Sequence, residues 1–155
     1  NDITLKYNNN QISLNTEELY LTSRLIDGVF PDYQQIIPNE FETSLVILKR
    51  DLIDNLKLVS VFSDKFHQVD LNIQKKEGVV ELKSRGDLGE SSAQIAATVE
   101  GNDAQVSFNA KYFIDCFQSL PSDSVQIGLN GPRKPLLVRG VGESSFTYLI
   151  MPVNR

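Results

Sequence analysis

Residues 45–59, LVILKRDLIDNLKLV, place a short apolar run directly before a segment with helical periodicity. The run at 45–48 predicts a buried strand. Leu52, Leu56 and Val59 recur at the spacing that puts them on one face of a helix. This stretch therefore predicts a strand that leads straight into an amphipathic helix.

A second stretch, residues 106–120, VSFNAKYFIDCFQSL, repeats the same order. Asn109 is a good N-cap residue, and Phe113, Phe117 and Leu120 fall on one helical stripe. Residues 53–56 align with residues 114–117, and the basic Arg50 aligns with Lys111. Because so short a similarity arises often by chance, the repeat rests mainly on the order of the elements.

Each predicted helix is followed by alternating apolar and polar residues, which is the pattern of half-buried antiparallel strands. These runs centre on residues 69–73, 80–82 and 95–99 after the first helix, and on 125–129, 136–138 and 146–150 after the second. A unit of strand, helix and three strands is thus written twice between residues 44 and 151. It predicts an α+β fold with two helices packed on one face of a sheet.

The first part of the chain predicts a separate three-stranded meander, with apolar alternation at residues 3–7, 12–14 and 19–25. Residues 26–43 contain Gly28, Pro31 and Pro38, which are too many breakers for one regular element. We expect a connector and a domain boundary there. The chain also begins within an alternating pattern, so we expect an upstream part.

Composition narrows the functional classes. The chain has 15 Lys and Arg against 20 Asp and Glu, a net charge of −5, one Cys and one His. One cysteine cannot form an internal disulfide, and one Cys with one His cannot supply a zinc site, so we expect a reducing cytoplasm and no metal. We see no signal peptide. The acidic balance argues against tight, charge-driven binding of nucleic acid.

The residues offer little support for catalysis. His67 opens an alternating strand, and Cys116 lies on the apolar side of the second helix, where a buried thiol acts as a small hydrophobe. Residues 140–142, GVG, lack the third glycine and the following helix of a dinucleotide loop, so a hairpin turn is the better reading. We expect no enzyme and no cofactor.

The two helices carry charge opposite their apolar stripes. Arg50, Asp54 and Lys57 share one outer face, and Lys111, Asp115 and Gln118 share the other. On composition alone, this is a solvated face with an i,i+4 ion pair between Arg50 and Asp54. The chain end, residues 148–155, either finishes a core strand or helps line a surface groove.

Three stretches resemble the bacterial β sliding clamps, the processivity subunit of DNA polymerase III: residues 25–33, LIDGVFPDY, residues 108–115, FNAKYFID, and residues 149–153, LIMPV. The resemblance implies that residues 1–37 are the end of the clamp's middle domain and residues 38–155 its complete third domain. It also implies a head-to-tail homodimeric ring around double-stranded DNA, with antiparallel sheets outside and two helices per domain on the inner face.

The resemblance assigns roles to particular residues. Arg50, Lys57 and Lys111 would face DNA, together with Arg24 and Lys49. A peptide pocket would bind the polymerase catalytic subunit, the clamp loader, other polymerases and repair proteins; its residues would be Pro31, Gln35, Ile36, Phe66, Asn109, Tyr112, Leu149, Met151, Pro152, Val153 and Asn154. Gln35 and the ending Asn154-Arg155 depart from the family pattern, so peptide preference is expected to differ.

Subunit closure in the family would use Val61 and Phe62 together with Asp87 and Glu90. The opposing surface belongs to a first domain that this chain lacks, so the chain alone is expected to be monomeric. The resemblance implies a non-catalytic accessory subunit. Two alternatives remain at this point: a β-rich protein-interaction module with no DNA role, and an α+β enzyme domain with unrecognised residues.

Overall fold

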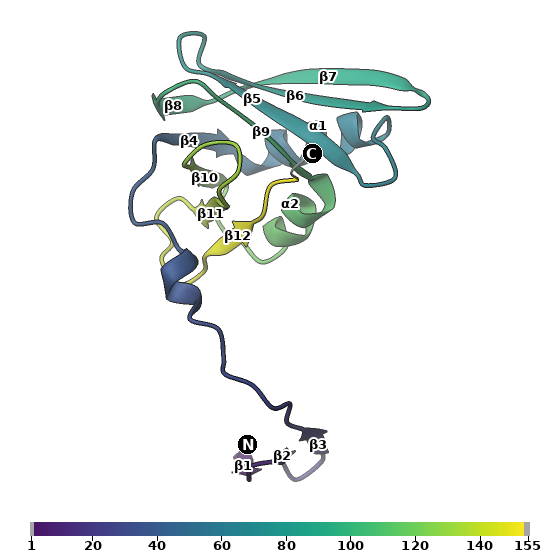
Figure 1. The fold of residues 1–155 in the computed structure, drawn as a ribbon, viewed down its shortest axis with the longest axis vertical. Helices are drawn as coiled ribbons and strands as arrows, with labels where there is room; N and C mark the ends of the chain where they lie inside the picture. The colour runs from purple at the N-terminus through teal and green to yellow at the C-terminus, as the bar shows by residue number, and fades with distance from the viewer. Residues whose placement is uncertain (1, 154–155) are drawn as a thin grey trace. The chain divides into compact units, whose positions relative to one another are not determined.

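The computed structural model describes residues 2–153 and divides into two compact units, residues 1–33 and residues 34–155. The division falls within the connector expected at residues 26–43. Each unit has its own sheets and is described by itself (Figure 1).

The first unit is an antiparallel meander of β1 (Thr4–Tyr7), β2 (Gln11–Asn15) and β3 (Tyr20–Arg24), which confirms the three expected strands. Side chains shape both turns. The Asn8 carboxamide oxygen accepts hydrogen bonds from the N–H groups of Asn10 and Gln11, each at 2.9 Å. Thr16 Oγ1 accepts one from the Leu19 N–H at 3.0 Å. These short local contacts fix the register of the strands.

The second unit begins with the 3-10 turn η1 (Tyr33–Ile36), whose first residue closes the first unit, and contains two sheets and two helices. Its elements are β4 (Thr43–Leu48), α1 (Lys49–Ser60), β5 (Gln68–Gln74), β6 (Val79–Gly86), β7 (Gly89–Ala96), β8 (Thr98–Gly101), β9 (Ala104–Asn109), α2 (Ala110–Phe117), β10 (Ser124–Leu129), β11 (Leu136–Gly140) and β12 (Tyr148–Ile150). One sheet has the order β12-β11-β10-β4-β8 and the other β7-β6-β5-β9.

Each repeat lends its first strand to the sheet of the other repeat. β4 pairs with β10, with Ile47 opposite Val125, and β9 pairs with β5, with Val106 opposite Leu71. The single sheet that the residue pattern alone predicts is therefore wrong, whereas the antiparallel sheets that the resemblance implies are confirmed: two form in this unit. Alternation along a strand specifies which face is buried, but it does not specify the neighbouring strand.

The run expected as one strand at 95–99 is also divided. β7 ends at Ala96, the Ala97 N–H donates to the Gly78 carbonyl at 2.8 Å, and β8 then pairs with β4 in the other sheet. The first repeat consequently has four strands after its helix. Ala97 is the point at which the chain passes from one sheet to the other.

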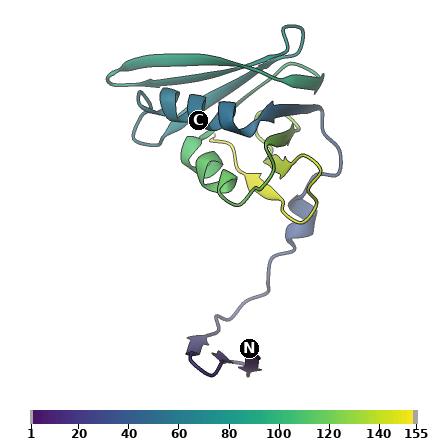
Figure 2. The ribbon, with the colours of Figure 1, turned by 180° about the vertical axis from the view of Figure 1, so that it is seen from behind.

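The core forms where the helices meet the inner faces of the sheets. α1 buries Leu52, Leu56 and Val59, as expected, and contributes about 1.5–3 kcal/mol for each side chain. α2 buries Phe113, which contacts Phe108 with ring centroids 4.4 Å apart. The two helices contact one another, α1 packs on the sheet of β5 to β7, and α2 packs on β12 (Figure 2).

Helix α2 starts as its sequence predicts, because Asn109 Oδ1 accepts a hydrogen bond from the Lys111 N–H at 2.9 Å. The chain enters α1 without a side-chain cap; there the Lys49 N–H donates to the Asp123 carbonyl at 2.8 Å. Among the described residues, no helix has the length and apolar character needed to cross a membrane.

Candidate DNA-facing helices and peptide site

The outer face of α1 carries the cations that the sequence places there. Arg50 and Lys57 are exposed, and Arg50 Nε lies 3.8 Å from Asp54 Oδ2, which confirms the expected i,i+4 pair. Both partners are largely exposed, so the pair stabilises the helix by no more than about 1 kcal/mol. Its main effect is to lower the positive charge that this face presents.

The outer face of α2 is similar in composition. Lys111, Asp115 and Gln118 are exposed. Lys111 follows directly on the buried Ala110, so the helix backbone fixes its position firmly while its side chain stays in solvent. The two contacting helices therefore each present a basic residue outside the core.

Lys49 has a different environment from the other expected DNA-facing residues. It is half-buried, and its ammonium donates a hydrogen bond to the Leu120 carbonyl at 2.7 Å. Leu120 follows α2, so this contact ties the start of α1 to the chain just beyond α2. The side chain is thus committed to the fold, a role that the spacing of charges along α1 does not reveal. Arg24 is exposed on β3, in the first unit.

Phe66 and Asn109, two expected pocket residues, are brought together by the loop before β5. The Asn109 side chain that caps α2 also donates from Nδ2 to the Phe66 carbonyl at 2.9 Å. Asp64 Oδ1 accepts from the Phe66 and Gln68 N–H groups, and His67 takes a positive φ of 53°. This tight turn holds the Phe66 ring outward, with 59% of the residue exposed.

Tyr112 and the end of the chain are neighbours because α2 packs against β12. The pKa of Tyr148 on β12 is raised, first by burial and then by the nearby Cys116, Asp115 and Tyr112. Tyr112 is 51% exposed and Met151 is 60% exposed. These large apolar surfaces are the kind that anchor residues of a peptide can cover.

The remaining expected pocket residues differ in how much surface they expose. Leu149 is half-buried opposite Leu137 in the β11–β12 pair, and Pro152 is buried, so Pro152 supports its neighbours and presents little surface. Val153 donates its N–H to the Ser107 carbonyl at 2.8 Å. Gln35 and Ile36 are exposed in η1, and Pro31 is exposed in the first unit; Asn154 lies outside the described residues.

The residues expected at a subunit interface gather at one end of the four-stranded sheet. A Cβ placed on Gly89 would lie 3.7 Å from the Phe62 ring. The β6–β7 turn, which contains Asp87, and the start of β7, which contains Glu90, therefore lie against the residues just after α1. Val61 is exposed, and β7 is an edge strand. Sequence reasoning missed Leu88, which is 86% exposed at this turn; its only signal is an apolar residue inside a turn of glycine and aspartate.

The structure also places His67 and Cys116, the two residues that the sequence analysis considered for catalysis and rejected. His67 is exposed in the turn before β5, and Cys116 is buried, which raises the pKa of its thiol to about 11. Within residues 2–153, His, Cys, Asp and Glu form no group of three or more that could hold a metal ion.

Two antiparallel sheets with a pair of contacting helices, whose solvent faces carry Arg50, Lys57 and Lys111, point to the class of the sliding clamps. Over 99% of this chain, the fold is similar to a DNA polymerase III beta subunit from Thermotoga maritima, with 28% identity, a TM-score of 0.88 and 42% of that chain covered. It is similar over the same share to a sliding clamp from Bartonella birtlesii solved bound to griselimycin, with 28% identity, a TM-score of 0.90 and 41% of that chain covered.

Residues 34–154 match the family described as DNA polymerase III beta subunit, C-terminal domain, and the chain belongs to this family. A beta sliding clamp from Synechocystis is 33% identical over 154 residues, which are 98% of this chain and 39% of that protein. One from Staphylococcus aureus is 27% identical over 155 residues, with 99% and 41% covered. The chain therefore spans about two fifths of the length of these relatives.

Proposed function

We propose that this chain is the C-terminal part of a clamp subunit that encircles double-stranded DNA and tethers the replicative polymerase. Residues 1–37 would close the middle domain, and residues 38–155 would form the third. The observation that carries the proposal is the pair of contacting helices α1 and α2, whose apolar sides are in the core and whose outer sides carry Arg50, Lys57 and Lys111.

The near balance of basic and acidic residues on this face suits a sliding ring. Asp54 partly offsets Arg50, Asp115 lies one helical turn from Lys111, and the whole chain has a net charge of −5. A ring holds DNA by topology, so phosphate contacts need only be few and independent of sequence. Stronger contacts would retard movement along the duplex.

We further propose that Phe66, Asn109, Tyr112, Leu149, Met151 and Val153 form part of a pocket for short linear peptides. The polymerase catalytic subunit, the clamp loader and repair proteins would dock there. Gln35, Ile36 and Asn154 would also contribute, with Pro152 as support. Met151 suits several partners, since the methionine side chain adapts its shape.

The subunit would be a non-catalytic accessory factor that works in the bacterial cytoplasm, at the nucleoid during replication. Val61, Phe62, Asp87 and Glu90, with Leu88 between the two acidic residues, would join the first domain of a second subunit. Two such contacts would close the homodimeric ring.

The test of the DNA face is charge reversal in the complete subunit. Lys111→Glu should lower binding to a short duplex several-fold at low salt, and the difference from the unmodified protein should shrink as salt rises. Lys76→Glu is the matched control, because Lys76 is also exposed but lies in the β5–β6 turn and belongs to neither helix. Equal loss in the two variants would rule out a DNA role for α2.

A further inference from the structure

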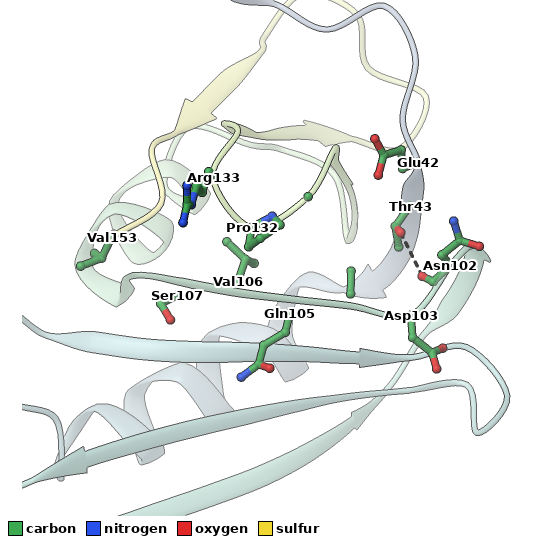
Figure 3. A pocket seen from close by; sticks show the side chains of 12 residues that line it. Glu42, Thr43, Asn102, Asp103, Gln105, Val106, Ser107, Pro132, Arg133 and Val153 are labelled. Carbon is green, nitrogen blue, oxygen red and sulfur yellow. Dashed lines mark hydrogen bonds between the residues drawn. The ribbon is translucent and has the colours of Figure 1, made fainter. Parts of the chain in front are cut away.

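A groove of about 610 Å³ runs along the outer edge of β9 (Figure 3). Strand β9 forms one wall. The turn at residues 131–133 and the start of β4 form the other, and Val153 closes one end. Ser107, at one end of the groove, is two residues before Asn109 in the sequence. Asn109 is a residue of the proposed peptide pocket, so the groove and the pocket meet at this end of β9.

The backbone of β9 has hydrogen-bonding groups that face this groove. The Ala110 N–H donates to the His67 carbonyl at 3.0 Å, which fixes the alternation with β5. Val106 and Phe108 therefore bond β5, while Gln105 and Ser107 turn their N–H and C=O groups outward. The bond from the Val153 N–H to the Ser107 carbonyl confirms that direction.

Only some of the outward backbone groups of β9 have a hydrogen-bond partner. Among the described residues, β9 has β5 as its one strand neighbour, and Val153 takes a single group, the Ser107 carbonyl. Within residues 2–153, the N–H and C=O of Gln105 and the N–H of Ser107 make no backbone bond to a second strand. Such a row is a template for strand addition by an extended peptide.

The two ends of the groove differ in charge. Arg133 lies toward the Val153 end, and Glu42 lies toward the end where Thr43 Oγ1 bonds the Asn102 carbonyl (Figure 3). Arg133 and Glu42 are both exposed, whereas Asp103 Oδ1 already accepts a hydrogen bond from the Lys75 N–H. Arg133 is therefore the cation available to a bound carboxylate.

We infer that this edge of β9 accepts, as an added strand, an extended segment that flanks the anchor of a docked peptide and carries an acidic residue toward Arg133. The inference rests on the proposed peptide-docking function, because Val153 links the groove to the pocket residues Met151 and Pro152. About four residues at roughly 3.4 Å each would match the free length of β9. The added strand would supply affinity through the backbone and selectivity through Arg133.

The experiment uses the complete subunit and a peptide from the clamp-binding segment of the DNA polymerase III catalytic subunit. The same peptide is also made with four added residues, Val-Thr-Val-Glu, at either end. Extension at one end should tighten binding by about five- to tenfold. N-methylation of alternate amides in the extension should abolish that gain without touching the protein.

Two matched pairs of variants locate the effect. Gln105→Pro should remove the gain because it deletes an outward N–H, while Gln105→Ala should keep it. Arg133→Glu should remove most of the gain, while Lys134→Glu, at an exposed neighbour outside the groove, should keep it.

If the short peptide binds and neither extension helps, the β9 inference is overturned and the pocket stands. If the short peptide itself fails to bind, both the proposed peptide pocket and the inference about β9 are rejected. Protection of the Gln105 and Ser107 amides from hydrogen exchange in the free protein would also overturn the inference, since the edge would already be filled by this chain.

Discussion

The ammonium of Lys49 donates a hydrogen bond to the carbonyl oxygen of Leu120 across 2.7 Å, joining the first residue of α1 to the residues that follow α2. The contact satisfies a carbonyl near the negative end of the α2 dipole. It adds a polar contact between the start of α1 and the chain beyond α2 to the direct packing of the two helices.

Replacing Lys49 should therefore affect stability before it affects any DNA contact. Lys49→Met should lower the free energy of unfolding by about 1–2 kcal/mol, because a partly buried carbonyl loses a charged donor. Urea denaturation measures the change. Lys57→Met, at an exposed position of the same helix, should change it by less than about 0.5 kcal/mol. A similar small effect for both variants would remove the structural role of Lys49.

Alanine substitutions at Gly101 and Gly131 distinguish the cost of backbone strain from the cost of a steric clash. Both have positive φ, 94° and 92°, so alanine at either should cost about 1–2 kcal/mol. A Cβ on Gly131 meets nothing within 4 Å, whereas one on Gly101 would collide with the Glu42 carbonyl where β8 meets β4. Thermal unfolding should show Gly101→Ala to be clearly the less stable protein; equal midpoints would contradict the β4–β8 contact.

The exposed apolar residues of the proposed pocket should behave as binding anchors. Tyr112→Ala and Met151→Ala in the complete subunit should each weaken a clamp-binding peptide by about 1–3 kcal/mol, as measured by titration calorimetry. Leu58→Ala is the control, since Leu58 is exposed to a similar extent on α1. Unchanged affinity in the two pocket variants would remove the assignment.

Burial of Cys116 should be visible as a pH dependence of stability. Its thiol pKa is raised from 9.0 to about 11, so the folded protein keeps a proton that the unfolded chain releases. The associated stability is complete below pH 9 and is lost as the pH rises toward 11. Denaturation midpoints of the unmodified protein and Cys116→Ala should differ in slope over this range; parallel slopes would show that the thiol titrates normally.

Periodicity and capping predict much of this fold. The stripes of Leu52, Leu56 and Phe113 identify both helices, and Asn109 marks where the second begins. The pairing of the strands was beyond reach, because burial of β4 would be equally satisfied in either sheet. Ala97 illustrates the same limit, since nothing in an alternating run marks the residue at which the chain changes sheets.

The candidate sites divide in the same way. Resemblance to the family supplied Tyr112, Met151 and Phe62, and local pattern supplied the Arg50–Asp54 pair. The hydrogen bond of Lys49 joins residues far apart in sequence, and the groove beside β9 depends on which backbone groups remain unpaired. Both arise only when distant segments meet, so no local spacing encodes them.

The exchange of β4 and β9 between the two sheets has a consequence for how residues 34–155 reach their native state. Neither half can complete a sheet by itself, so an isolated half would expose apolar strand faces, and a partially folded molecule should be rare. A chain cut in the turn between β8 and β9 should yield two pieces that need each other. Such mutual dependence would make residues 34–155 fold and unfold as a single cooperative unit.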